Sequence, residues 1–247
     1  MGIIEIMLIK CKKQRKNIIV LAFVSILLIL LSYSIFNIVL WVSDGDRTNK
    51  QISNIAEIIN KSGVDFDKLK NINADTKGWL KVHGTNIDYP FLQANDNNFY
   101  LTHSFDKSVN QAGWLFLDYR NDIDNLDKNT IIYAHARIDG TMFGSMKNVL
   151  GQDWYSNKDN HIIKIYSEKQ ETKWGVFSVY RIKTTDDYIQ TSFNSTDDFK
   201  SFLGLISNRS IHNFNNPTGN NDKILTLSTC YNDTEKIVLH AKLISIK

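Results

Sequence analysis

Residues 226–230 read Thr226-Leu227-Ser228-Thr229-Cys230 and end an apolar stretch whose side chains alternate between two faces, as in a β-strand. The chain has one other cysteine, Cys11, which precedes a long apolar run near the N-terminus. If that run spans a bilayer, the two thiols lie on opposite sides and cannot form a disulfide. A lone exported thiol is open to oxidation, so we interpret Cys230 as reactive; a small packed core residue is the alternative.

The sequence around Cys230 favours a nucleophile. A short connection, residues 231–235, leads into the last strand, and in a hairpin of this length Lys236 lies opposite Cys230. A fixed cation beside the sulfur favours the thiolate, although a solvated lysine at a strand end is the plainer interpretation. Among the histidines, His135 is the best acid–base candidate, because it directly follows the apolar strand 131–134; the others lie in turns, loops or strands, where packed or surface roles are expected.

Other chemistries have little support. His and Cys residues are not clustered at the spacing of metal ligands, and glycine-rich phosphate loops are absent from the sequence. The formal charge of +3 is mild and partly local to a basic N-terminal cluster. We therefore predict no metal site, no nucleotide chemistry and no broad basic face for nucleic acid.

The N-terminal part predicts a single membrane anchor. Residues 17–43 carry no charge and exceed the roughly 20 residues needed to cross a bilayer. A cleavable signal peptide is the alternative, but the apolar run is longer than the core of such a peptide and no convincing cleavage site follows it. Cations precede the run: Lys10, Lys12, Lys13, Arg15 and Lys16. The positive-inside rule then places residues 1–16 in the cytoplasm and residues 44–247 outside the cell.

The exported part is interpreted as a helical segment, residues 44–75, followed by one mainly β domain, residues 76–247. Apolar periodicity predicts one helix at about 52–61 and a shorter one within 66–72. Strands rich in β-branched and aromatic residues are predicted at 79–82, 87–90, 113–118, 130–134, 161–166, 174–182, 223–229 and 237–246. Short strands separated mostly by polar loops predict a closed or nearly closed, antiparallel-rich barrel. Two helices interrupt it, one at about 141–150 and one that Ser195 can cap.

Several of these segments resemble one known family. Residues 226–230 are similar to the TLxTC signature of sortases, the cysteine transpeptidases of Gram-positive cell surfaces, and Ser228 fits their class B. Residues 78–90, residues 139–143 and the helix from Ser195 also look like class B segments, so the resemblance covers about residues 50–247. It implies an eight-stranded sortase β-barrel with N-terminal helices and a helix before the last strands, preceded by one transmembrane helix.

The resemblance also implies a reaction. Cys230 would attack the carbonyl of a threonine in a C-terminal sorting signal of the Asn-Pro-x-Thr type, and the acyl group would pass to a peptidoglycan amine. His135 matches the histidine that protonates the leaving amine. Lys236 stands where the family carries an arginine that holds substrate carbonyls and the oxyanion. The positions that match substrate contacts are Asn97, Leu101, Thr184, Tyr188, Ile189 and Ser228. No metal or organic cofactor is implied; the implied partners are surface proteins with a sorting signal, the wall peptide and the membrane.

Two departures from the family pattern concern activity more than fold. A lysine at position 236 lacks the planar donor fork of arginine, and Ala134 stands where glycine is usual. Arg137 is a candidate cation to compensate for this loss.

A second hypothesis is a protein with the sortase fold that binds sorting signals as a scaffold, without catalysis. For Tyr188 and Ile189, the alternative role is packing within their loop. A papain-type hydrolase is disfavoured, because Cys230 ends a strand late in the chain.

Overall fold

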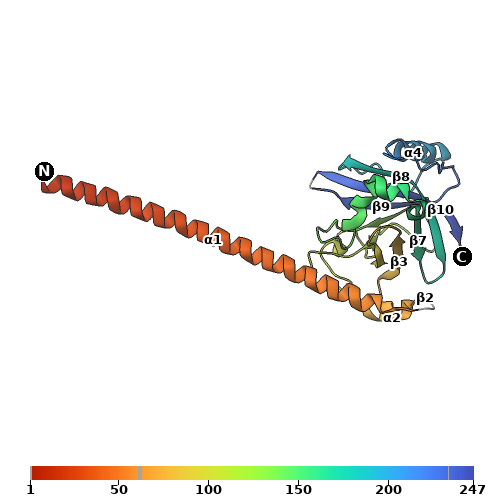
Figure 1. The fold of residues 1–247 in the computed structure, drawn as a ribbon, viewed down its shortest axis with the longest axis horizontal. Helices are drawn as coiled ribbons and strands as arrows, with labels where there is room; N and C mark the ends of the chain where they lie inside the picture. The colour runs from red at the N-terminus through yellow and green to blue at the C-terminus, as the bar shows by residue number, and fades with distance from the viewer. Residues whose placement is uncertain (1, 61–62, 233) are drawn as a thin grey trace. The chain divides into compact units, whose positions relative to one another are not determined.

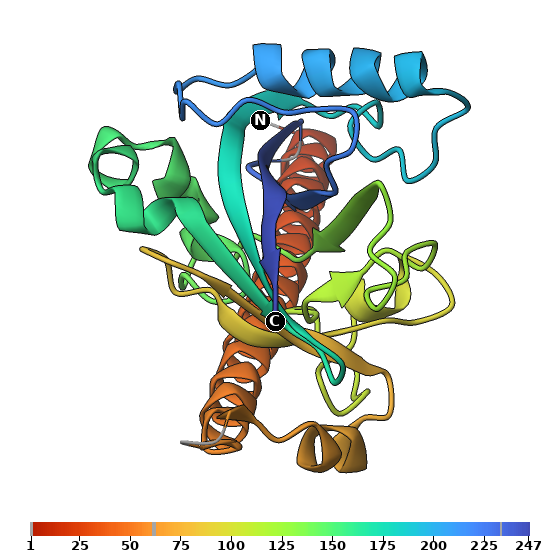
Figure 2. The same ribbon diagram turned by 90° about the vertical axis from the view of Figure 1, so that its right-hand side faces the viewer.

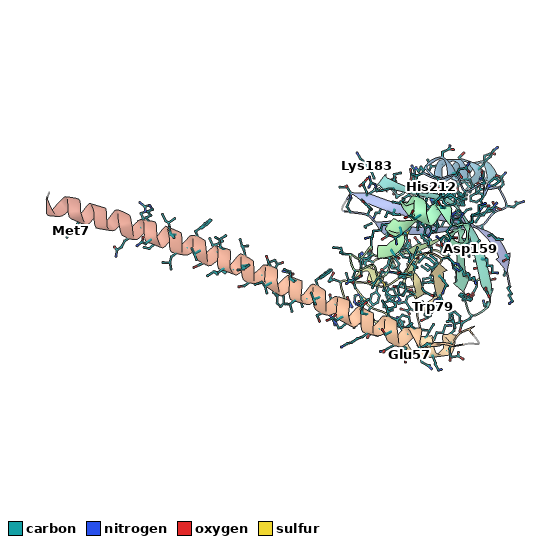
Figure 3. The ribbon with its side chains drawn as sticks, in the orientation of Figure 1. Met7, Glu57, Trp79, Asp159, Lys183 and His212 are labelled. Atoms are coloured by element: carbon teal, nitrogen blue, oxygen red, sulfur yellow. The ribbon has the colours of Figure 1, made fainter. Side chains whose placement is uncertain are left out.

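The computed structural model describes residues 2–60, 63–232 and 234–247, and it divides into two compact units, Met1–Arg47 and Thr48–Lys247. Helix α1 (Ile3–Ala56) makes up the first unit and ends within the second (Figure 1). The apolar side chains between Ile18 and Val42 are exposed and stand out around the helix (Figure 3). The stretch Gln14–Ala56 is long and apolar enough to cross a membrane.

The helix predicted separately at about 52–61 is instead the end of α1. The helix continues past Gly45 and closes at Ala56, before the two-residue strand β1 (Ile59–Asn60). One glycine inside a helix costs only about 1 kcal/mol relative to alanine, which is too little to interrupt a helix of this length. The strand β2 (Gly63–Val64) pairs with β1.

The predicted short helix that follows is confirmed as α2 (Phe66–Ile72). Asp65 caps it, because its side chain accepts a hydrogen bond from the backbone N–H of Lys68. Leu69 is fully buried and packs α2 against the hydrophobic core of the second unit, to which α2 belongs.

In the part of the chain that the structure describes, eight strands close into a barrel, as predicted. They are β3 (Thr76–Val82), β4 (Asp88–Leu92), β5 (Phe116–Leu117), β6 (Asn129–Tyr133), β7 (Ile162–Tyr166), β8 (Glu171–Lys183), β9 (Ile224–Cys230) and β10 (Glu235–Ile246). Around the barrel their order is β10-β8-β7-β3-β4-β5-β6-β9. Neighbours are antiparallel except for two pairs, β4 with β5 and β6 with β9.

The helix predicted at about 141–150 is confirmed, and its geometry is that of a 3₁₀ helix. It is the 3₁₀ helix η2 (Gly144–Leu150), and Phe143 at its start offers no capping side chain. Without a cap, the terminal turns form hydrogen bonds between residues three positions apart, as in a 3₁₀ helix. One example is the bond from the Met146 N–H to the Phe143 carbonyl, at 2.9 Å. The other short helices are η1 (Phe99–Leu101), α3 (Gln152–Ser156) and η3 (Lys158–His161).

The helix predicted before the last strands is confirmed as α4 (Thr196–Asn208), and Figure 2 shows it lying across one side of the barrel. The Ser195 hydroxyl accepts from the backbone N–H of Asp198 at 3.1 Å, as expected of a cap. The buried face of α4 consists of Phe199, Phe202, Leu203 and Ile206. It packs on side chains of β8, β9 and β10, and thereby joins the β8–α4 loop to the barrel.

Candidate active site

Two neighbouring parallel strands bring Cys230 and His135 to the same edge of the barrel. Strand β6 pairs with β9 in the register Tyr133 to Ser228, so both chains reach this edge together. The Thr229 hydroxyl then donates to the Ala134 carbonyl at 2.7 Å and ties the two strand ends to each other. Parallel strands lie about 4.8 Å apart. Cys230 and His135, which directly follow the two hydrogen-bonded residues, therefore project from adjacent positions.

Lys236 lies directly opposite Cys230, as the hairpin register predicted. The two residues pair across β9 and β10, and the Lys236 Nζ donates a hydrogen bond to the Cys230 Sγ at 3.0 Å. The Cys230 thiol is free and exposed, whereas the side chain of Cys11 lies outside the described residues. An ammonium at this distance stabilises negative charge on the sulfur.

His135 is held by the loop that precedes β5. Its Nε2 lies 2.8 Å from the Leu101 carbonyl, which can only accept, so Nε2 carries a proton and Nδ1 is the nitrogen left to exchange one. Gly113 has a φ of +61° and passes so close to the ring that a Cβ would lie 3.0 Å from the His135 Cδ2. Glycine at this position therefore makes room for the imidazole.

All nine predicted site residues line one groove of about 680 Å³. Asn97 and Leu101 come from the segment before β5, Thr184, Tyr188 and Ile189 from the loop after β8, and the others from the strand ends just described. The groove also includes six residues that are not among these nine: Phe116, Tyr133, Ala134, Thr185, Asp186 and Thr229. Five of these six lie within two residues of a predicted site residue, which was the one signal available for them, whereas Phe116 has no such neighbour.

Tyr188 and Ser228 both line the groove and contact each other. The Tyr188 side chain is buried, and its hydroxyl lies 2.9 Å from the Ser228 hydroxyl. Burial raises the pKa of Tyr188, so the phenol stays neutral at physiological pH. A neutral hydroxyl pair two residues before the thiol offers hydrogen-bonding capacity without a competing charge.

Asn97 is oriented by a buried carboxylate. Its amide donates to the Asp118 Oδ2 at 3.0 Å and accepts from the Tyr119 N–H at 3.0 Å. Although burial opposes ionisation, hydrogen bonds from Arg120, Asn97 and Tyr133 keep the pKa of Asp118 below its ordinary value. The other N–H of Asn97 makes no hydrogen bond with the described residues.

Arg137 is not part of the groove. Its guanidinium pairs with Asp139, with the Nη2 2.8 Å from the Oδ2, and its side chain is largely buried. The idea that Arg137 compensates for a lysine at position 236 is therefore not supported by this arrangement. Among the described residues, no cluster of three His, Cys, Asp or Glu side chains is placed to hold a metal ion.

Comparisons with known proteins agree with this geometry. The model of the sortase domain matches residues 80–244. Sortase B of Staphylococcus aureus is 37% identical over 185 residues, which cover 73% of this chain and 75% of that protein. The structure of a Staphylococcus aureus sortase B–substrate complex matches with a TM-score of 0.68 over 73% of this chain and 84% of that one, at 37% identity.

A sortase B structure from Bacillus anthracis matches with a TM-score of 0.76 at 32% identity, over 83% of this chain and 99% of that one. The sortase domain thus spans most of the sequence, and a groove with a cysteine, a histidine and a cation lies within it. The chain therefore belongs to the sortases, the cysteine transpeptidases that act on sorting signals, and within them to class B.

Proposed function

We propose that this sortase is anchored in the cell membrane by its N-terminal helix and cleaves an Asn-Pro-x-Thr-like signal after the threonine, then joins the carbonyl to a peptidoglycan amine. The observation that carries the proposal is the contact of 3.0 Å between the Lys236 Nζ and the Cys230 Sγ, in one groove with His135. An exposed thiol beside a fixed cation is the arrangement that a covalent mechanism requires.

The reaction follows from the roles of these three side chains. The Cys230 thiolate attacks the threonine carbonyl, and the Lys236 ammonium stabilises the oxyanion that develops. The oxyanion collapses, the C–N bond breaks, and protonated His135 gives its proton to the leaving amine. An incoming amine then attacks the thioester, loses a proton to His135 and expels the thiolate, so the enzyme returns to its starting state.

The groove walls suggest how the signal lies. Asn97 and Leu101 come from the segment before β5, Thr184, Tyr188 and Ile189 from the loop after β8, and Ser228 from β9. We assign these six residues to the binding of the signal. The anchor would hold the thiol outside the membrane, because the basic cluster before residue 17 favours a cytoplasmic N-terminus.

The full chain in detergent micelles tests this function. With an Asn-Pro-x-Thr peptide and an oligoglycine or wall-peptide amine, mass spectrometry should find the ligated product, and a peptide with the same residues in scrambled order should give none. Labelling of Cys230 in intact cells by a membrane-impermeant maleimide tests the orientation. Failure to process any of a panel of sorting signals would overturn the proposal.

Lys236 should contribute most of the oxyanion stabilisation by a side chain. We expect Lys236→Ala to lower kcat/KM about 10²- to 10³-fold, because loss of one oxyanion donor has this effect in other acyl transferases. Lys236→Arg should keep or raise activity, since a guanidinium adds a second donor. Steady-state cleavage of the peptide measures both.

The matched control is Lys183→Ala, since Lys183 is an exposed lysine at the end of the neighbouring strand β8 and does not line the groove (Figure 3). It should leave kcat/KM unchanged. A large loss in Lys236→Arg would show that the site is adapted to lysine, and wild-type rates in Lys236→Ala would exclude a role for this cation.

A further inference from the structure

The loop after β8 is held by hydrogen bonds to a buried side chain of the barrel, at the residues where the loop lines the groove. Asn129, the first residue of β6, is fully buried, and its Nδ2 lies 3.2 Å from the Tyr188 carbonyl and 2.8 Å from the Gln190 carbonyl. Both hydrogens of this amide are thus donated to the two residues that flank Ile189. Because carbonyls only accept, these contacts also decide which side of the Asn129 amide is nitrogen.

The opposite side of Asn129 continues into a chain of buried hydrogen bonds. Its Oδ1 lies 2.6 Å from the Thr226 hydroxyl, which lies 2.9 Å from the His240 Nδ1. The His240 Nε2 in turn lies 2.9 Å from the Tyr180 hydroxyl. All four side chains have at most 1% of their surface exposed.

The direction of every bond in this chain is determined. The single hydrogen of Thr226 must go to the Asn129 oxygen, so the His240 Nδ1 donates to Thr226 and the Nε2 accepts from Tyr180. Burial lowers the pKa of His240 to about 3, so the ring is neutral at pH 7, as this arrangement requires. Hydrogen bonds that point the same way strengthen one another.

Further contacts hold the same loop from outside the barrel. The Arg120 Nη2 donates to the Ile189 carbonyl at 3.1 Å, and both Arg209 Nη atoms donate to the Asp187 carboxylate, at 2.7 and 2.6 Å. The carbonyls of three consecutive residues, 188 to 190, are therefore all engaged. These contacts hold residues 188–190, which form one wall of the groove, in place before a peptide binds. Binding therefore does not have to supply the free energy of ordering this wall.

We propose that Asn129 is a positioning residue that holds the Tyr188–Gln190 wall in its binding conformation, and that Tyr180, His240 and Thr226 orient its amide. The proposal assigns a function to the Thr226 hydroxyl, which takes no part in the reaction itself. The assignment of the wall to the sorting signal rests on the proposed function, whereas the anchoring of the loop does not.

Asn129→Ala in the full chain tests the anchor. We expect the KM for the Asn-Pro-x-Thr peptide to rise about three- to tenfold with kcat within about twofold, because the wall touches the bound signal and not the thiol. Hydrogen–deuterium exchange of peptides within 184–195, measured without substrate, should become about tenfold faster as the loop loses two hydrogen bonds.

Asn121→Ala is the matched control. Asn121 is also a buried asparagine, and its side chain bonds to the Asn129 carbonyl, the Ile131 N–H and Asp127, none of which belongs to the loop. Its loss should lower the melting temperature without a change in KM or in exchange at 184–195. Equal effects of the two variants on exchange, or a loss in kcat with KM unchanged, would overturn the proposal.

The orienting chain is tested at Thr226. Thr226→Val keeps the shape but removes the hydroxyl, so it should reproduce the faster exchange and raised KM of Asn129→Ala, and Thr226→Ser should restore wild-type behaviour. A valine variant with wild-type exchange would show that the chain does not orient Asn129. If the wild-type protein processes no sorting signal, the proposed function fails, yet the exchange comparison still decides whether Asn129 anchors the loop.

Discussion

We expect Cys230→Ala to abolish cleavage of an Asn-Pro-x-Thr peptide, with a loss in kcat of about 10⁴-fold or more, the scale on which loss of a covalent nucleophile acts. The thiol is exposed, so alanine creates no cavity and the melting temperature should stay at the wild-type value. Intact-protein mass spectrometry after a short incubation with peptide should show an acyl adduct on the wild-type chain and none on the variant.

The second cysteine is the natural control. Cys11→Ala in the full chain should keep both the adduct and the turnover, since Cys11 precedes the apolar run and Cys230 is the thiol in the groove. Full turnover by Cys230→Ala would refute the covalent mechanism. A wild-type chain that binds the peptide without forming an adduct would instead favour the scaffold hypothesis.

His135→Ala should lower kcat about 10²- to 10⁴-fold, the contribution expected of a general acid and base. The loss concerns both half-reactions, because the same ring protonates the leaving amine and deprotonates the incoming one. Single-turnover kinetics with the peptide, followed by addition of an amine to the trapped thioester, measures the two steps separately.

His103→Gln is the matched control for this experiment. His103 follows Leu101, which accepts the hydrogen bond of His135, but its ring stacks on Phe99 and does not line the groove. The variant should turn over peptide at the wild-type rate. A His135→Ala enzyme that retains both half-reactions would show that another group transfers the proton.

The strands and the pairing of Cys230 with Lys236 could be predicted because their signals are local. Alternation of apolar side chains, turn residues and the connection at 231–235 are enough to pair β9 with β10 and to place Lys236 opposite Cys230. Each predicted barrel strand overlaps an observed one. The capped helix α4 was predictable for the same reason, because its cap and its apolar face lie within a few residues of each other.

The error in the N-terminal part arose where the chain offers no local stop signal, because nothing between the apolar run and residue 56 interrupts α1. The helix at 141–150 was predictable, but its 3₁₀ geometry was not, since Phe143 offers no capping side chain. Arg137 illustrates another limit. Its distance of two residues from His135 made it a candidate for the groove, but the position of Asp139 decides where its guanidinium points.

The sequence by itself determined the β-rich domain, the apolar N-terminal helix and the family, because periodicity, turn chemistry and motifs are properties of short segments. The tertiary structure alone decided that nine residues from distant segments line one groove, and that Asn129, Thr226 and His240 form one directed chain beneath it. The longest hydrogen bond of this chain joins residues 97 positions apart, Asn129 and Thr226. Their partners are therefore chosen by barrel closure and strand register, which no short stretch of sequence contains.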